Sequence, residues 1–93
     1  MKPTVEVRVA SLLAELVGGA SHIPAQGETV RQLLENLDSQ FPGITESIID
    51  PRGRLHGHII IYRNEEDIRS LKELETPLED GDIIHIMEAL SGG

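Results

Sequence analysis

The sequence contains no cysteine. That absence excludes disulfide bonds, zinc sites built on thiolates and cysteine nucleophiles, and it means that the fold needs no oxidising compartment. No basic segment followed by an apolar run opens the sequence, and no apolar run approaches the length that crosses a bilayer. We therefore expect a cytoplasmic protein that has no membrane partner.

Aromatic and basic residues are both scarce. Phe41 and Tyr62 are the only aromatic residues, so the core is expected to be aliphatic. Eight Lys and Arg stand against 16 Asp and Glu, which gives a net charge of −8. A chain with this charge repels phosphate backbones, and it has few rings on which bases could stack. We expect no nucleic-acid partner, and a protein with a basic docking face fits the charge better.

The first third of the chain predicts a strand, a turn and a second strand. At 93 residues, the sequence is long enough for one domain. Valines at every second position predict a half-buried strand over residues 4–10. Leucines then suggest one helical turn that stops at Gly18-Gly19, and a short strand follows over about residues 21–24. The leucines of that turn are Leu12, Leu13 and Leu16.

The clearest element is an amphipathic helix that begins after Thr29. Thr29 suits the N-cap position, and Gln32 three residues later completes a capping-box pattern. The helix is expected to end at Pro42-Gly43, because the residue before a proline is pushed out of the α region. A single apolar stripe predicts that one face packs on a sheet. The stripe consists of Val30, Leu33, Leu34, Leu37 and Phe41.

The second half of the chain predicts strands joined by tight turns. Residues 50–53 (DPRG) suit a type I turn, and β-branched residues predict a strand over 58–64. NEEDIR indicates a reversal into a short edge strand, and LEDGD indicates a turn into a last strand over 83–87. The order of elements predicts an α+β fold, in which one main helix packs on one face of a mixed sheet.

The histidines and glycines give no site with side-chain chemistry. His56 and His58 would share a strand face, but no third metal ligand is evident, so surface histidines are the ordinary interpretation. Gly18-Gly19 does not follow a strand and open a helix, as phosphate-binding glycines do. We expect no metal and no cofactor bound by the chain itself.

The outer face of the predicted sheet carries an apolar patch. If Ile84 and Ile86 face the helix, their neighbours face away from it, and the same alternation holds in the strand over 58–64. The patch is either covered by a loop or serves as a docking surface, and the sequence leaves both open. Its predicted members are Ile60, Tyr62, Ile83, His85 and Met87.

Gly92-Gly93 suggests a tail that enters a foreign active site. We expect a folded domain over residues 1–87 and a flexible tail over 88–93, which reaches about 20 Å when extended. Two glycines can pass a slot too narrow for other residues. The carboxylate of Gly93 becomes reactive once a partner converts it to an acyl-adenylate, and docking of the apolar patch would offset the entropy of ordering the tail. Further tail residues expected to contact the partner are Glu88, Ala89, Leu90 and Ser91.

These features resemble a known family. DPRGRLH, a strand that ends YRNEEDIR, TPLEDGD and the terminal glycine pair are similar to the ubiquitin-like sulfur carriers of the MoaD/ThiS family. The closest likeness is to the CysO-like, cysteine-biosynthesis subgroup. The resemblance covers nearly the whole chain and implies a β-grasp (ubiquitin-like) fold whose first and last strands are parallel neighbours. The chain departs from the family at Glu88, where a proline is common, and at Arg63, where a hydrophobic residue is common.

The resemblance also implies a chemistry. A ubiquitin-activating-type adenylyltransferase/sulfurtransferase, using ATP and Mg²⁺, would adenylate Gly93 and convert it to a thiocarboxylate. The sulfur would pass to a PLP-dependent cysteine synthase, to a pterin-handling subunit in molybdopterin synthesis, or into a thiamine-type pathway. The chain would then be a protein co-substrate and no enzyme. Two alternatives remain open: a protein modifier that forms isopeptide bonds through the same glycine, and a β-grasp binding module with an incidental terminus.

Overall fold

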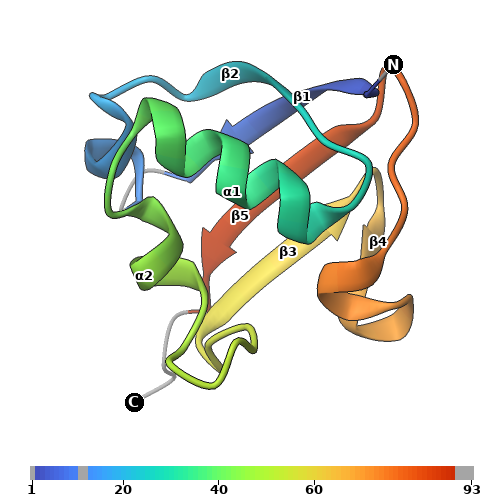
Figure 1. Ribbon diagram of the computed structural model, residues 1–93. Coiled ribbons are helices and arrows are strands. Elements are labelled where there is room, and N and C mark those ends of the chain that lie inside the picture. Colours follow the sequence, from blue (N-terminus) through green and yellow to red (C-terminus); the bar gives the residue numbers. More distant parts are fainter. Residues whose placement is uncertain (1, 11–12, 90–93) are drawn as a thin grey trace.

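The computed structural model describes residues 2–10 and 13–89, which form one mixed sheet with helices against it (Figure 1). The strand order is β2-β1-β5-β3-β4. The strands are β1 (Thr4–Val9), β2 (His22–Gln26), β3 (Ile59–Arg63), β4 (Glu66–Asp67) and β5 (Ile83–Glu88). The α-helices are α1 (Val30–Gln40) and α2 (Ile44–Ile48), and the 3-10 helices are η1 (Ala14–Val17), η2 (Ile68–Ser70) and η3 (Glu73–Glu75).

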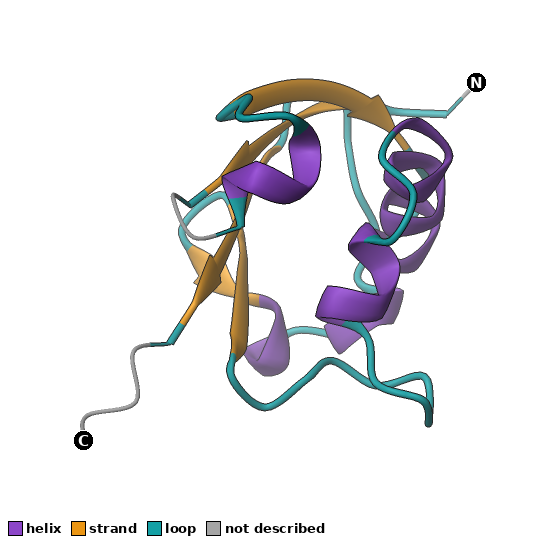
Figure 2. Cartoon of the chain, turned by 90° about the vertical axis from the view of Figure 1, so that its left-hand side faces the viewer, coloured by secondary structure: helices purple, strands orange, loops and turns teal. Residues whose placement is uncertain are grey.

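The centre of the sheet is the parallel pair of β1 and β5, the first and last strands of the chain. β2 lies antiparallel beside β1, and β3 lies antiparallel between β5 and the short edge strand β4. Figure 2 shows the described helices on the same side of the curved sheet, with the other side open. The predicted α+β architecture, with one main helix on one face of a mixed sheet, is therefore confirmed. No helix among residues 2–10 and 13–89 is long and apolar enough to cross a membrane.

An aliphatic core fills the space between the sheet and α1. The inward side chains of β3 and β5 are fully buried, with Ile59, Ile61 and Ile84 at 0% exposure and Ile86 at 1%. The predicted alternation along these strands is confirmed by their burial pattern. Four of the five residues of the predicted helical stripe are buried as well, whereas Phe41 is half-buried at the position where α1 ends.

The N-terminus of α1 is capped nearly as the sequence predicts. The side chain of Thr29 accepts a hydrogen bond from the backbone N–H of Gln32 at 3.2 Å. The side chain of Gln32 reaches back to the N–H of Glu28 at 2.7 Å, one residue before the usual partner. Two orphan N–H groups are satisfied in this way, which fixes where the helix begins.

Three short segments differ from the expectation or were not foreseen. In the predicted helical turn, Leu16 is 37% exposed and Val17 is buried in its place, because the segment is a tighter 3-10 helix. β2 continues two residues beyond the predicted end. The helix α2 was not predicted at all, since five residues are too few to show a helical period.

Gly27 joins β2 to α1 at a point of close approach. A Cβ atom placed on Gly27 would lie 2.6 Å from the backbone nitrogen of Leu33 and 2.8 Å from its Cα. Real side chains do not come so close to backbone atoms, so only glycine lets β2 pass this tightly into the capped helix.

We expect Gly27→Ala to lower the free energy of unfolding by about 1–3 kcal/mol, because the new methyl group would have to push β2 away from α1. Urea denaturation followed by circular dichroism measures the change. Gly57→Ala is the matched control, since nothing lies within 4 Å of a Cβ placed there. Equal stability of the two variants would show that the link from β2 to α1 is not tight.

Candidate functional site

The outer face of the sheet collects the five predicted patch residues. Tyr62 lies directly opposite His85, and Ile60 lies directly opposite Met87, in the antiparallel pair of β3 and β5. Ile83 lies on the same face of β5, two residues from His85. All five are partly exposed. The residues that alternate with them along β3 and β5 (Ile61, Ile84 and Ile86) are buried in the core. We call these five residues the outer patch.

Figure 2 shows that the helices are on the other side of the sheet. Because no residue of the outer patch is buried, its side chains reach solvent in the part of the chain that the structure describes. Within those residues, the outer patch is therefore a partly exposed surface. A partly exposed apolar group of this kind, bordered by polar residues, is compatible with a protein-docking surface.

Polar residues of β1 border the outer patch. Parallel pairing places Arg8 beside His85 and Glu6 beside Ile83. Arg8 donates to the carboxylate of Glu6, and this hydrogen bond is the main reason why the pKa of Glu6 is below its usual value. A shallow hollow lies at this border, lined by Arg8, Asn64, Glu65, Glu66, Ile83 and His85. Sequence reasoning missed Arg8, although the parallel pairing of the first and last strands could have placed it here.

The last strand runs one residue further than predicted. Glu88 pairs with Ile59 in the sheet, and the N–H of Ala89 donates to the carbonyl of His58 at 2.7 Å. Glu88 therefore belongs to β5. The position at which the chain has Glu88 and the family commonly has a proline is thus the last residue of the strand. The other predicted tail residues, Leu90, Ser91, Gly92 and Gly93, lie outside the described residues.

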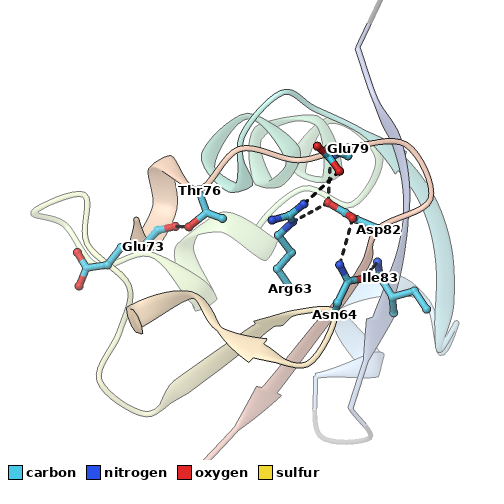
Figure 3. A network of polar contacts seen from close by, with 7 residues as sticks. All are labelled: Arg63, Asn64, Glu73, Thr76, Glu79, Asp82 and Ile83. Carbon is cyan, nitrogen blue, oxygen red and sulfur yellow. Dashed lines mark hydrogen bonds and ion pairs between the residues drawn. The ribbon is translucent and has the colours of Figure 1, made fainter. Parts of the chain in front are cut away.

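A buried carboxylate holds the turn that leads into β5 (Figure 3). Asp82 is 6% exposed and accepts hydrogen bonds from Arg63 at 2.7 Å and from Asn64 at 3.2 Å. The N–H of Glu79 also donates to Asp82, at 2.8 Å. Burial alone would raise the pKa of Asp82, but these donors outweigh it and hold the pKa below the usual value. The same ion pair raises the pKa of Arg63.

This network fixes β3 against β5. Asn64 adopts a left-handed conformation (φ 57°), its side chain accepts from the N–H of Ile83 at 3.0 Å, and its own N–H donates to the carbonyl of Ile83 at 2.7 Å. Tyr62 and His85, on the same strands, are held opposite each other as a result. Arg63, the second departure from the family, pairs with Asp82 and contributes no side chain to the outer patch.

His56 and His58, which the sequence places two residues apart, lie close together in the structure. His56 and His58 lie with their ring centroids 5.3 Å apart, and a ring nitrogen of His56 is 3.3 Å from the carbonyl of Glu46. Among residues 2–10 and 13–89, no group of three or more His, Cys, Asp or Glu is arranged to hold a metal ion.

A central parallel strand pair in a mixed five-stranded sheet, with one main helix on one face, defines a ubiquitin-like β-grasp fold. The model of the ThiS family matches residues 7–93. The chain belongs to the ThiS family.

Three relatives show how close the similarity is. The sulfur carrier protein CysO of Mycobacterium tuberculosis is 35% identical over 91 residues, which are 96% of this chain and 98% of the relative. CysO in the BexX/CysO complex of Amycolatopsis orientalis has a TM-score of 0.89 at 32% identity, covering 96% of this chain and 99% of that one. Small archaeal modifier protein 1 of Methanosarcina acetivorans has a TM-score of 0.84 at 33% identity, covering 100% and 99%. The suspected family and fold are thus confirmed.

We expect Asp82→Asn to lower the free energy of unfolding by about 1–3 kcal/mol at neutral pH, because the charged hydrogen bond to Arg63 is lost. The folded-state pKa of Asp82 is depressed, so its contribution is complete above the unfolded-state aspartate pKa of about 3.9 and is lost as pH falls below that value toward the folded-state pKa. The stability difference between wild type and variant should therefore shrink over that range. Urea titrations at several pH values measure it.

Glu35→Gln is the control for this prediction, since Glu35 is exposed on α1 and makes the same change of charge. A difference between wild type and Asp82→Asn that stays constant as pH falls below the ordinary aspartate pKa of about 3.9 would contradict a depressed pKa for Asp82.

Proposed function

We propose that the chain is a sulfur carrier whose reactive group is the carboxylate of Gly93. In the first step this carboxylate attacks the α-phosphate of ATP on an adenylating partner, which forms an acyl-adenylate and releases pyrophosphate. In the second step a sulfur nucleophile displaces AMP and leaves a thiocarboxylate. Mg²⁺ and ATP belong to the partner, and the chain is its protein co-substrate. The observation that carries the proposal is the family match, which extends through Gly93 and covers nearly the full length of CysO.

The outer patch supports this proposal because it supplies a docking surface on the same strand that leads to the glycines. β5 contributes Ile83, His85 and Met87 to the patch and ends at Glu88. The last hydrogen bond to the sheet among the described residues is that of Ala89, and four residues follow it. Four extended residues span at most about 13 Å, so a docked partner would have to hold its ATP within that distance of the end of β5.

Docking would have to offset the backbone entropy that the terminal residues lose when a partner orders them. Fixing a free residue in one backbone conformation costs about 1–2 kcal/mol, and glycine is at the costly end. Apolar contacts with the outer patch would offset this cost and bring the terminal carboxylate to the adenylating site at high effective concentration. The carrier then needs no catalytic side chain of its own.

For the acceptor, we propose a PLP-dependent cysteine synthase. The similarity to CysO, at 35% identity, favours this pathway over a pterin-handling acceptor or a thiamine-type pathway. The complex of BexX with CysO shows that a protein similar to this chain binds a protein partner.

A second candidate function is protein modification. The similarity to small archaeal modifier protein 1, at 33% identity over the whole chain, favours it specifically. In this case a lysine amine would attack the same acyl-adenylate, or a thioester derived from it, and form an isopeptide bond. Mass spectrometry separates the two functions. Replacement of one oxygen by sulfur in the intact mass of the carrier supports sulfur transfer. In a tryptic digest, lysines of other proteins that carry residues 73–93 of this chain support conjugation, because the last basic residue before the glycines is Lys72.

We expect Gly93→Leu to abolish adenylation while the melting temperature stays nearly unchanged, because the leucine side chain would not pass the narrow entry to an adenylating site. Exchange of radiolabelled pyrophosphate into ATP measures adenylation by the partner enzyme. Gly57→Leu is the control, since Gly57 has open space around it. Full exchange activity of Gly93→Leu would contradict the proposal.

We expect Tyr62→Ala to raise the KM of the adenylating enzyme for this carrier by about tenfold and to leave kcat nearly unchanged, because it removes an apolar anchor used in docking. Leu16→Ala is the matched control: Leu16 is an exposed large hydrophobic residue outside the outer patch. If the two variants have the same KM, the partner docks elsewhere.

A further inference from the structure

The basic residues of this acidic chain are unevenly distributed. Five of the eight Lys and Arg lie in three segments, namely α1, residues 52–54 and residues 69–72. Four of the five surround one hollow on the helix side of the sheet, between the loop at residues 50–57 and η3. We call this hollow the basic hollow. It is lined by Arg31, Arg54, Arg69 and Lys72, with Glu73 and Glu75 at its rim.

Two arginines of the basic hollow are fixed in place by the backbone. Arg69 donates to the carbonyl of Ile59 at 2.7 Å and to that of His56 at 2.9 Å. Arg31 donates to Glu75 at 2.6 Å and to the carbonyl of Gly53 at 3.3 Å. Carbonyl oxygens orient a guanidinium without neutralising it. The charge of Arg69 is therefore held in one position and remains uncompensated among the described residues.

The segment that carries Lys72 is also fixed. Thr76 is 1% exposed, and its hydroxyl donates to the carbonyl of Glu73 at 2.7 Å (Figure 3). The same oxygen accepts from the N–H of Lys72 at 3.1 Å, and the carbonyl of Thr76 accepts from the N–H of Val30 at 3.1 Å. The backbone at Lys72 is thus tied to the first turn of α1, and the basic hollow has a rigid wall.

Arg54 and Lys72 are exposed and make no ion pair among residues 2–10 and 13–89. The acidic residue nearest to Arg54 in sequence is Asp50, and its carboxylate binds backbone groups. It accepts hydrogen bonds from the backbone N–H of Arg54 at 3.0 Å and of Arg52 at 2.9 Å. The positive charges of Arg54 and Lys72 therefore remain uncompensated among the described residues, at the hollow that they line.

We propose that the basic hollow is a second docking site, which binds an acidic peptide segment of a partner protein. Such a segment can place separate carboxylates on Arg54 and Lys72. A single small anion fits less well, because the cations are spread around an open hollow and one small anion cannot contact them together. Nucleic acid fits less well still, because the hollow contains no aromatic ring on which a base could stack.

This site goes beyond the proposed sulfur transfer. The basic hollow includes residues of α1 and η3, which lie on the helix side, whereas the outer patch is on the open side of the sheet (Figures 1 and 2). One partner can therefore occupy the outer patch while another occupies the basic hollow. The class of partner is defined by its chemistry: a protein with two or more neighbouring Asp or Glu side chains in an exposed segment.

The test uses a fluorophore-labelled hexaglutamate peptide and fluorescence anisotropy with the full chain at about 50 mM salt, where screening is weak. We expect Lys72→Gln to weaken binding about threefold and Arg54→Gln with Lys72→Gln to weaken it about fivefold or more. Lys2→Gln is matched to Lys72→Gln in charge and is expected to have no more than a small effect. Neither Arg54 nor Lys72 forms a side-chain hydrogen bond within the described residues, so the fold should be unchanged.

Three results would overturn the proposal. The first is a failure of the wild-type chain to bind the peptide. An equal loss of binding in Lys2→Gln and Lys72→Gln counts with it, because it would mean that the peptide is attracted by overall charge and not by a site. The second is competition by inorganic phosphate as strong as by unlabelled peptide, which would indicate a small-anion site.

The third result separates this site from the outer patch. We expect Tyr62→Ala to bind hexaglutamate like wild type, and the double variant Arg54→Gln, Lys72→Gln to support pyrophosphate exchange at the wild-type rate. If Tyr62→Ala loses peptide binding, or the double variant loses exchange, there is one docking surface and no second site. Failure of Gly93 to be adenylated would leave the peptide result intact, so the two proposals fail independently.

Discussion

The structure depends on the position of β5 between β1 and β3. The strand is paired on both sides, parallel with the first strand of the chain and antiparallel with β3. Its inward residues Ile84 and Ile86 are buried in the core, and its outward residues form the middle of the outer patch. One strand therefore links core packing, the docking surface and the start of the terminal segment. A change in its register by one residue would exchange the two faces and remove both the core contacts and the outer patch.

A costly polar network sets that register. Burying a carboxylate is unfavourable unless it is paired and hydrogen-bonded, and Asp82 has Arg63, Asn64 and a backbone N–H as partners. The geometry that results is directional: an apolar residue at position 82 could pack there but would not orient Asn64 toward Ile83. The ion pair between β3 and the turn before β5 thus has a positional role, which explains why a charged residue is present at Arg63.

Much of the fold can be predicted from the sequence, because its long elements have clear periods. The valines of β1, the isoleucines of β3 and β5 and the stripe of α1 all lie where alternation or helical spacing places them. The short elements α2, η2 and η3 were missed for a physical reason: they are too short to show a period of their own and are stabilised by packing on α1, on β3 or on each other. The tight passage at Gly27 is likewise invisible in the sequence, since it depends on where Leu33 lies in space.

The residues of the candidate site divide in the same way: some follow from the pattern of one strand, and others depend on contacts between distant parts of the chain. The outward side chains of β3 and β5 follow from alternation within each strand, so the members of the outer patch could be named from the sequence. Alternation within one strand does not give the neighbours Arg8 and Glu6, because they depend on the pairing of the first strand with the last, far apart in the sequence. The basic hollow depends on such contacts even more, since it joins α1 to two later loops.

The proposed chemistry requires a carrier that is reactive only when a partner makes it so. The sequence has no cysteine that could attack the proposed acyl-adenylate or form a mixed disulfide with the proposed thiocarboxylate, and the buried carboxylate of Asp82 is paired with Arg63. What remains exposed is suited to recognition: apolar contacts on one side of the sheet and separated cations on the other. Salt screens contacts between charges, whereas apolar contacts depend on the burial of surface and are not screened in this way. Two partners that use the two sides would therefore respond differently to ionic strength.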